Sequence, residues 1–281
     1  MSSEDPEGAP LTGEPLALVD RWGSTDAASA AVGADGGVHR HGDTTRIQRV
    51  ASITKLCTAW AALVASEEGA LSLDDPLGQP GSTVRHVLSH ASGLDFDTDA
   101  VIAAPAARRI YSNTGYELIA SHIERVSGIP FPEYLEEAVL EPLGMSTAEL
   151  RGSAAKDLWC SIEDLLLLAR ELAQTRLLHP DTAADARRSQ FPDLAGVLPG
   201  WGRQDPCSWG LGPELAGTKS PHWTGSTSSP GTYGHFGGSG TMLWIDPAAE
   251  VTCVAVCDRD FGEWAVTAWP PFSDAVRATY S

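Results

Sequence analysis

A serine and a lysine stand three residues apart in the segment Ser52-Ile-Thr-Lys55. Residues at this spacing share one face of a helix, so the hydroxyl would lie beside the amine. A buried lysine has a lowered pKa and can accept a proton, and a serine hydroxyl needs such a neighbour to become a nucleophile. Ser52 also stands at a helix start, where unpaired backbone amides can stabilise an oxyanion. On its own, the pair fits a serine helix cap followed by an ordinary lysine better than a catalytic pair, because this spacing occurs often by chance.

Two further segments contain residue types that such chemistry requires. Tyr111-Ser-Asn113 precedes an amphipathic stretch; a tyrosine near a cationic lysine can be held partly as phenolate and act as a base. The Asn113 amide can orient a substrate or the lysine. His235-Phe-Gly237-Gly238 opens a strand, where glycines let a substrate approach the backbone and the histidine can carry a proton. A helix entry and a glycine-rich hairpin are the structural alternatives.

Together, the order and spacing of these segments resemble the penicillin-recognising serine hydrolases, which have SxxK, a second motif and a Lys/His-x-Gly strand. The tyrosine of the second motif resembles the branch of class C β-lactamases, DD-peptidases and family VIII esterases. The resemblance extends from about residue 15 to the C-terminus. Its other stretches are Val50-Ala-Ser-Ile-Thr-Lys55, Leu88-Ser-His-Ala-Ser-Gly-Leu94, Tyr111-Ser-Asn-Thr-Gly-Tyr116, Pro142-Leu-Gly-Met145 and Gly234-His-Phe-Gly-Gly-Ser-Gly240, which runs on to Asp246-Pro247.

The resemblance implies a catalytic role for three residues. Ser52 would be the acylated nucleophile, Lys55 its partner base or electrostatic activator, and Tyr111 the general base and acid. Asn113 would orient an amide of the substrate.

The third motif supplies the remaining implied contacts. His235 would take the place of the conserved cation, Gly237 would admit the substrate, and the backbone amides of Ser52 and Gly238 would form the oxyanion hole. Histidine replaces the lysine typical of class C β-lactamases, which lowers the expectation of lactamase activity. A neutral histidine attracts a carboxylate poorly, so we expect neutral esters to be preferred.

Three tryptophans precede the third motif in a segment dense in glycine and proline, from about Gly196 to Gly231. In the resembled family this region borders the cleft. We therefore expect Trp201, Trp209 and Trp223 to flank the substrate and to favour a flat or apolar acyl group. Anchoring of an irregular loop to the core is the alternative for each of them.

The leading hypothesis is therefore a serine esterase or amidase for a small or medium acyl substrate, acting through an acyl-enzyme on Ser52. The alternatives are a β-lactamase or DD-peptidase, a biosynthetic acyltransferase, and a sensor that binds lactam or peptide without turnover. We expect no cofactor and no metal. His86 and His90 have helical spacing, and His39 and His41 share a strand face, but no third ligand follows.

Composition excludes several other classes of partner. The 281 residues carry a net charge of −18, which disfavours nucleic acid and anionic membrane surfaces. No apolar run reaches the roughly 18 residues of a membrane span. The five cysteines are scattered without a CxxC, and the first residues are acidic, so we expect a cytoplasmic protein with reduced thiols. The oligomeric state stays open.

The elements that must position these motifs are strands at both ends of the chain and helices between them. This order predicts an α+β fold with three layers: one antiparallel sheet, helices on both of its faces, and an inserted helical region. We assign residues 14–50 and 206–281 to the sheet domain and 51–205 to the insertion. Residues 1–13 read as a loose tail, and the active site would lie at the interface.

The individual elements follow from hydrophobic periodicity and from breaker residues. A helix from Ser52 to about Glu68 is apolar on nearly every side, as expected of a central buried helix. Strands are expected at Thr232–Phe236, Thr241–Ile245 and Val251–Cys257. A closing helix over Ala265–Tyr280 would be broken at its two prolines.

Overall fold

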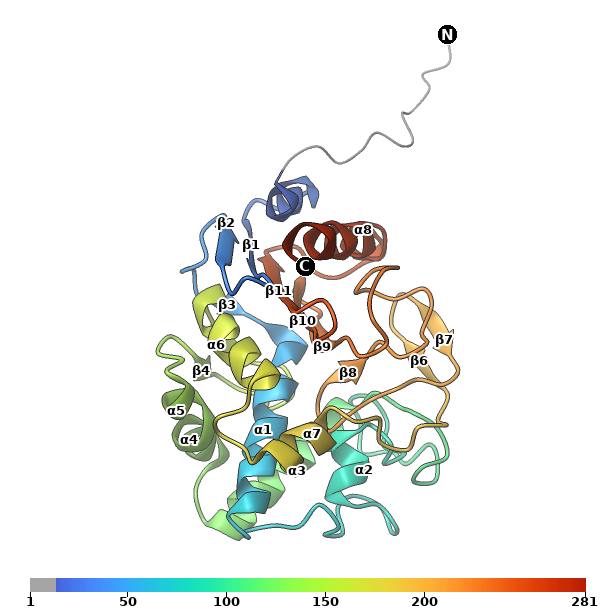
Figure 1. Ribbon diagram of the computed structural model, residues 1–281. Helices are drawn as coiled ribbons and strands as arrows, with labels where there is room; N and C mark the ends of the chain where they lie inside the picture. The colour runs from blue at the N-terminus through green and yellow to red at the C-terminus, as the bar shows by residue number, and fades with distance from the viewer. Residues whose placement is uncertain (1–13) are drawn as a thin grey trace.

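A six-stranded antiparallel sheet forms the centre of the computed structural model, which describes residues 14–281 (Figure 1). The tail expected at residues 1–13 lies outside this range. The strands, in spatial order, are β2 (Val38–His41), β1 (Ala27–Val32), β11 (Val251–Cys257), β10 (Thr241–Asp246), β9 (Tyr233–Gly237) and β8 (Glu214–Leu215). β1 pairs with β11 from Ala27 opposite Cys257 to Val32 opposite Thr252. The predicted sheet, built from both ends of the chain, is confirmed.

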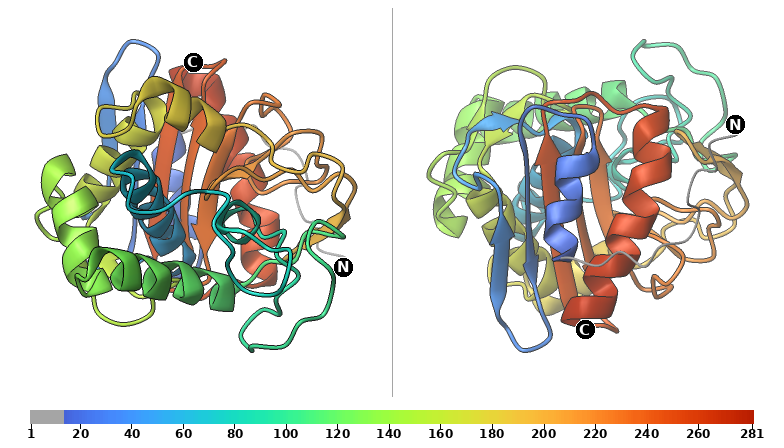
Figure 2. Two further views of the ribbon diagram at one scale, coloured as in Figure 1. Left: turned by 90° about the horizontal axis from the view of Figure 1, so that it is seen from below. Right: turned by 90° about the horizontal axis from the view of Figure 1, so that it is seen from above.

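Helices cover both faces of this sheet, as the three-layer prediction requires. One face carries η1 (Pro15–Arg21) and α8 (Glu263–Tyr280), which lie side by side over the strands (Figure 2, right). The other face carries α1 (Thr54–Glu67) and α6 (Ile162–Ala173). Residues of β1, β9, β10 and β11 therefore enter two separate hydrophobic clusters, one on each face of the sheet.

The helix that follows Ser52 is buried on every side. Every residue of α1 from Thr54 to Leu63 is inaccessible to solvent. Its C-terminal turn ends at Gly69, which has φ of 77°, a conformation that glycine adopts without the steric cost of a side chain. The central position predicted from its composition is confirmed. The short turn that contains Ser52 leads directly into α1.

The closing helix differs from the prediction because it is not broken at its prolines. α8 is continuous from Glu263 to Tyr280, with Pro270 and Pro271 inside it. Proline in a helix costs about 3 kcal/mol. Trp269, Phe272 and Val276 are fully buried against the sheet, and each contributes about 1.5–3 kcal/mol. Tertiary packing therefore outweighs the local penalty.

The remaining elements lie between the two sheet-forming segments. The helices are α2 (Val84–Leu88), α3 (Asn113–Ser127), α4 (Phe131–Leu135), the π-helical turn η3 (Glu136–Leu140), α5 (Glu141–Leu143) and α7 (Pro180–Ala186). Two small sheets consist of β3 (Gln48–Arg49), β5 (Leu158–Cys160) and β4 (Glu149–Leu150), and of β6 (Gly196–Leu198) and β7 (Gly202–Gln204). The segment expected to be irregular thus contains β6, β7 and β8. No helix within residues 14–281 combines the length and the hydrophobicity that a bilayer crossing requires.

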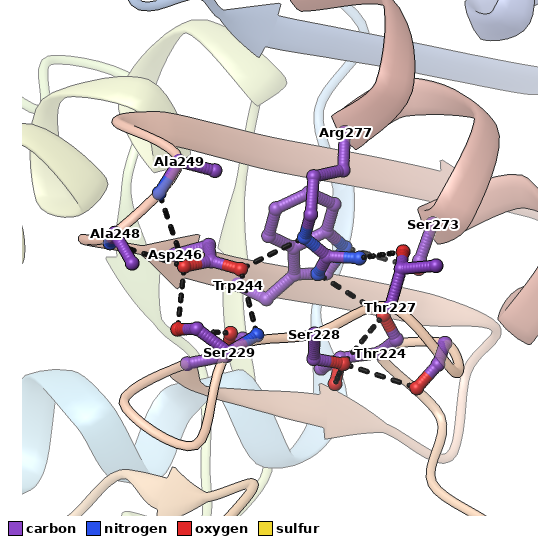
Figure 3. A network of polar contacts seen from close by, with 12 residues as sticks. Thr224, Thr227, Ser228, Ser229, Trp244, Asp246, Ala248, Ala249, Ser273 and Arg277 are labelled. Carbon is purple, nitrogen blue, oxygen red and sulfur yellow. Dashed lines mark hydrogen bonds and ion pairs between the residues drawn. The ribbon is translucent and has the colours of Figure 1, made fainter. Parts of the chain in front are cut away.

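A polar network at the end of β10 ties the loop before β9 to α8 (Figure 3). The Asp246 carboxylate accepts hydrogen bonds from the backbone amide of Ser229, at 3.1 Å, and from its hydroxyl, at 2.6 Å. Arg277 of α8 donates to the same carboxylate at 2.8 Å and to the Thr224 carbonyl at 3.2 Å. Burial acts against ionisation, but these donors prevail and lower the pKa of Asp246 to about 2. These contacts fix the position of the loop that leads into β9.

Candidate active site

The nucleophile turn is strained and is fastened to the third-motif hairpin. Ala51 has φ of 44°, a left-handed conformation that costs a non-glycine residue about 1–2 kcal/mol, and it turns the chain from Val50 into the half-buried Ser52. The Thr241 hydroxyl donates to the Val50 carbonyl at 2.9 Å. Ser239 donates in the same way to the preceding carbonyl, also at 2.9 Å. These bonds hold the turn against the end of β9.

Lys55 is entirely buried below Ser52, one helical turn further along. Its Nζ lies 3.3 Å from Ser52 Oγ, 2.6 Å from Asn113 Oδ1 and 2.9 Å from the Ala155 carbonyl oxygen. Burial holds the pKa of Lys55 well below its usual value, although the charge of Glu117 acts in the opposite direction. The side chain is thus a buried amine surrounded by uncharged acceptors, as the sequence interpretation requires of a proton acceptor.

The second motif enters α3 through Ser112 rather than Asn113. Ser112 is the N-cap of α3 and accepts from the Gly115 amide at 3.1 Å, which leaves the Asn113 side chain free for the site. Asn113 contacts Lys55 with its oxygen and donates from its nitrogen to Asp97 Oδ1 at 2.8 Å. The hydrogen bond to Asp97 fixes the orientation of the Asn113 amide, so that its oxygen points to Lys55. Asn113 therefore orients the lysine.

Tyr111 lies in an aromatic enclosure above Lys55. Its ring centroid is 4.6 Å from Lys55 Nζ, 4.5 Å from the His90 ring and 5.8 Å from Trp209. Burial raises the pKa of Tyr111, although a hydrogen bond with Ser52 acts in the opposite direction. Desolvation of the hydroxyl is the largest effect and opposes the partial phenolate expected from the sequence, and the pKa of the neighbouring Lys55 is lowered as well.

The third motif borders the site with an incompletely covered strand. β8 pairs with β9 only at Tyr233 and Gly234, so His235 and the residues after it have no β8 partner. A side chain at Gly237 would collide with the Val50 carbonyl and with Thr241. A side chain at Gly238 would meet nothing within 4 Å. Gly237 thus lets the nucleophile turn approach β9, whereas Gly238 faces open space.

His235 is buried beside Tyr111 and carries no charge at neutral pH. The Tyr111 hydroxyl lies 3.4 Å from His235 Nε2. Burial, and secondarily the charge of Lys55, lowers the pKa of His235 to about 4. The histidine is therefore not the fixed cation for which it substitutes in the motif, in agreement with the expectation from its ordinary pKa.

The three tryptophans do not share one environment. Trp209 stacks edge-on to His235 at 5.7 Å and also contacts Tyr111. Trp201 and Trp223 instead pack on Phe236, at 5.7 and 5.6 Å, in the hydrophobic cluster that α8 covers. The prediction that all three flank the substrate is wrong for Trp201 and Trp223, because Phe236 points to the face of the sheet opposite His235.

Four site neighbours were not singled out from the sequence as part of the serine site. Two of them, His90 and Phe96, pack on the Tyr111 ring, at 4.5 and 6.0 Å. The other two, Asp97 and Ala155, hold Asn113 and Lys55. The LSHASGL segment contained a signal for His90, but loop residues such as Phe96 and Asp97 follow no periodicity that would place them.

The paired histidines considered as metal ligands do not converge. α2 ends at Leu88, and His90 has φ of 57°, so it does not share a helix face with His86. His41 pairs with Asp20, and His39 stacks on Tyr280. Residues 14–281 contain no group of three or more histidine, cysteine, aspartate or glutamate side chains arranged to hold a metal ion.

Comparison with known proteins gives relatives and structural neighbours of this chain. The crystal structure of a β-lactamase from Mycobacterium bovis, Mb2281c, is 47% identical with a TM-score of 0.92, over 95% of this chain and 99% of that one. EstCE1, described as a hydrolase with promiscuous acyltransferase activity, is 18% identical with a TM-score of 0.77, over 94% and 97% of the two chains. At that identity, EstCE1 shows the fold alone.

Curated relatives match shorter stretches of the chain. D-alanyl-D-alanine-carboxypeptidase/endopeptidase AmpH of Escherichia coli (strain K12) is 27% identical over 151 residues, which cover 39% of this chain and 39% of AmpH. The matched stretches span less than half the length of these relatives. The family model described as Beta-lactamase matches residues 18–276, nearly the whole chain. The chain therefore belongs to the beta-lactamase family, whose members share this serine-hydrolase fold.

Proposed function

We propose that this protein hydrolyses carboxylic esters of small or medium acyl groups through an acyl-enzyme on Ser52. The observation that carries the proposal is the buried Lys55 amine, 3.3 Å from Ser52 Oγ and held by Asn113 and Ala155. Burial holds the pKa of Lys55 well below its usual value and so favours the neutral amine, which can take the serine proton.

The environment of the site favours uncharged substrates. His235 has a pKa of about 4, so it supplies no positive charge for a substrate carboxylate at neutral pH. Trp209 and the half-exposed Phe96 add apolar surface around Tyr111. An ester with an apolar acyl group gains from these rings, whereas a carboxylate-bearing lactam or peptide lacks a counter-ion.

Oxyanion stabilisation in this mechanism falls to the backbone amides of Ser52 and Gly238. Ser52 stands at the start of the helical segment, where amides lack intrahelical partners. The Gly238 amide donates to no other group among residues 14–281, and its Cα faces open space. Two such backbone donors would meet the needs of a tetrahedral intermediate.

The test is turnover of a p-nitrophenyl ester series, together with labelling by a fluorophosphonate. We expect hydrolysis by the wild-type protein and labelling at Ser52, identified by peptide mass spectrometry. The Ser52→Ala variant should lose both, whereas Ser146→Ala, in an exposed turn, should lose neither. Labelling at another serine, or unchanged hydrolysis by Ser52→Ala, would refute the proposal.

Peptidase or lactamase activity is the second candidate, favoured by the incompletely covered edge of β9. An extended peptide could add to β9 beyond Gly234, where β8 ends. The curated relatives include proteins named as D-alanyl-D-alanine carboxypeptidases. Intact-mass spectrometry after exposure to D-Ala-D-Ala peptides and to nitrocefin distinguishes the candidates, because it shows which acyl groups load Ser52 and which are released. An alcohol could also replace water in the step that releases the acyl group from Ser52, which would make the protein an acyltransferase.

The cytoplasm is our proposed location. Five cysteines carry free, buried thiols, and burial raises the pKa of Cys57 to about 12, so these thiols are unreactive hydrophobic side chains. This pattern suits a reducing compartment. Fractionation of the native host with an antibody to the protein tests the proposal, and recovery from the culture medium or the envelope would contradict it.

A further inference from the structure

The orientation of the His235 ring fixes which of its nitrogens carries hydrogen. Nδ1 lies 2.7 Å from the carbonyl oxygen of Phe236. A carbonyl oxygen can only accept a hydrogen bond, so Nδ1 must be the donor. A neutral imidazole has a single N–H, and Nε2 is therefore left with a lone pair. The ring presents an acceptor to the site, not a donor.

The group that faces this lone pair is the Tyr111 hydroxyl, at 3.4 Å. Such long contacts are common in unliganded active sites and shorten when substrate binds. A phenol can donate its hydrogen to Nε2, whereas a phenolate would place one lone pair against another. The contact is therefore favourable only while Tyr111 is protonated. A lysine at position 235 would instead favour the phenolate of Tyr111, because an ammonium group only donates hydrogen bonds.

A doubly protonated His235 would remove this constraint, but the charges around the ring oppose it. The charged or titratable groups near the ring are Lys55 of α1, Glu214 of β8 and the fully buried His90. Burial is the largest effect and favours the neutral ring, Lys55 adds to it, and Glu214 opposes it without prevailing. Glu214 is already committed to Lys219, at 2.8 Å, and to His222, at 3.1 Å.

We infer that His235 is a positioning residue that accepts the Tyr111 hydrogen, so that Tyr111 enters the reaction as a proton donor and Lys55 is the base for Ser52. This inference rests on the proposed function and assigns the direction of proton flow within it. It reverses the role that the resemblance implied for Tyr111 in the first step.

With these roles, every proton released in the acylation step is taken up by a named group. The neutral Lys55 amine takes the Ser52 proton while Oγ bonds to the acyl carbon and the carbonyl π pair moves onto its oxygen. When the adduct collapses, the bond to the alcohol oxygen breaks, the Tyr111 hydrogen turns from His235 Nε2 toward that oxygen, and the oxygen takes it as a proton. The Lys55 ammonium then returns a proton to the Tyr111 oxygen, so both groups recover their starting forms.

The experiment compares His235→Gln, which retains an acceptor, with His235→Lys, which provides only donors. For each, kcat/KM for p-nitrophenyl butyrate is measured from about pH 6 to pH 10. We expect His235→Gln to lose no more than about tenfold with the wild-type pH profile, and His235→Lys to lose about 100-fold or more at neutral pH. His39→Gln and His39→Lys, on the partly exposed β2 strand, are the matched controls.

The ionisation state of Tyr111 supplies a readout that a merely structural role for His235 would not move. Tyrosinate absorbance is titrated in the protein and in Tyr111→Phe, and the difference isolates Tyr111. We expect no Tyr111 tyrosinate below about pH 10 in the wild type and a clear lowering of its pKa in His235→Lys.

Two different failures are distinguishable. Higher activity of His235→Lys at neutral pH, with its ascending limb moved to lower pH, would overturn the inference, because it would make the phenolate the working base. In that case wild-type turnover and Ser52 labelling would persist. Absence of both turnover and labelling in the wild type would instead refute the proposed function itself.

Discussion

The residues of the site are held in place by hydrogen bonds from neighbouring segments of the chain. Lys55 has three oxygen neighbours and no carboxylate within hydrogen-bond distance among them. Asn113 is oriented from behind by Asp97. Ala51 stores strain in a left-handed conformation directly before Ser52. Such arrangements cost stability, and their position at one serine agrees with a function for it.

Ser52 and Lys55 should behave as one unit. We expect Ser52→Ala and Lys55→Ala each to lower kcat/KM by about 10³-fold or more, and the double variant to lose no more than either single one. Lys156→Ala is the matched control. Lys156 is half-exposed and its ion pair with Asp97, at 3.8 Å, is weak, so this variant should lose no more than about threefold in kcat/KM. Multiplicative losses in the double variant would show that the two residues act independently.

Adjacent glycines provide a second prediction at this scale. Gly237→Ala should lower kcat by about 100-fold and destabilise the protein, because the new methyl group pushes Val50 and the nucleophile turn away from β9. Gly238→Ala should keep the wild-type melting temperature and change KM alone, since its methyl group enters open space. The measurements are Michaelis–Menten kinetics and thermal melts; a wild-type kcat in Gly237→Ala would exclude this account of the turn.

At the scale of elements, β9 separates two functions within consecutive residues. His235 and Trp209 pack on Tyr111, whereas Phe236, Trp201 and Trp223 pack in the cluster under α8. Because consecutive residues of β9 point to opposite faces of the sheet, an aromatic residue that packs on His235 lies at the site, and one that packs on Phe236 lies in the core.

Substitution of the two kinds of tryptophan should separate these effects. Trp209→Phe should change the preference among p-nitrophenyl esters of increasing chain length, and it also removes the donor at 3.0 Å from the Gly212 carbonyl. Trp223→Phe removes the donor at 2.9 Å from the buried Glu214 carboxylate and should lower the unfolding free energy by about 1–3 kcal/mol. Its chain-length preference should match that of the wild type. An altered preference in Trp223→Phe would place this residue at the substrate after all.

Elements with strong periodicity could be predicted from the sequence, and those governed by tertiary packing could not. The capping box of α6, formed by Ser161 and Asp164, is one example, because it depends on two residue types three positions apart. The continuity of α8 through its prolines was not visible, because the compensating burial of Trp269 depends on distant strands. The serine, lysine and tyrosine motifs came from spacing, whereas the ring orientation of His235 depends on a neighbouring carbonyl group.

For the molecule as a whole, buried histidines determine the response to acid. Five of the eight histidines have pKa values below the ordinary one, with burial as the leading cause: His86, His90, His122, His222 and His235. In the unfolded chain these groups take up protons below about pH 6.5, whereas in the folded protein they do so only at lower pH. Unfolding therefore binds protons, and stability falls as the pH falls through that value.

The unfolding free energy should accordingly be lower at about pH 5 than at about pH 7.5. His235 alone, with a folded pKa of about 4, contributes about 2 kcal/mol to this loss at the lower pH. Urea titrations at both values measure it, and His235→Gln should reduce the difference by that amount. Equal stabilities at the two values would contradict the burial of uncharged histidines.

The pairing of β1 with β11 also has a consequence for the order of events in biosynthesis. Ala27 pairs with Cys257, so the centre of the sheet joins residues that leave the ribosome far apart in time. Until β11 emerges, α1 has no sheet to cover its apolar surface, although its own residues are already complete. Contacts of such long sequence separation slow folding and leave hydrophobic surface exposed meanwhile. The nascent chain is therefore a natural client for a chaperone, and expression yield should depend on chaperone supply more than the stability of the finished fold would indicate.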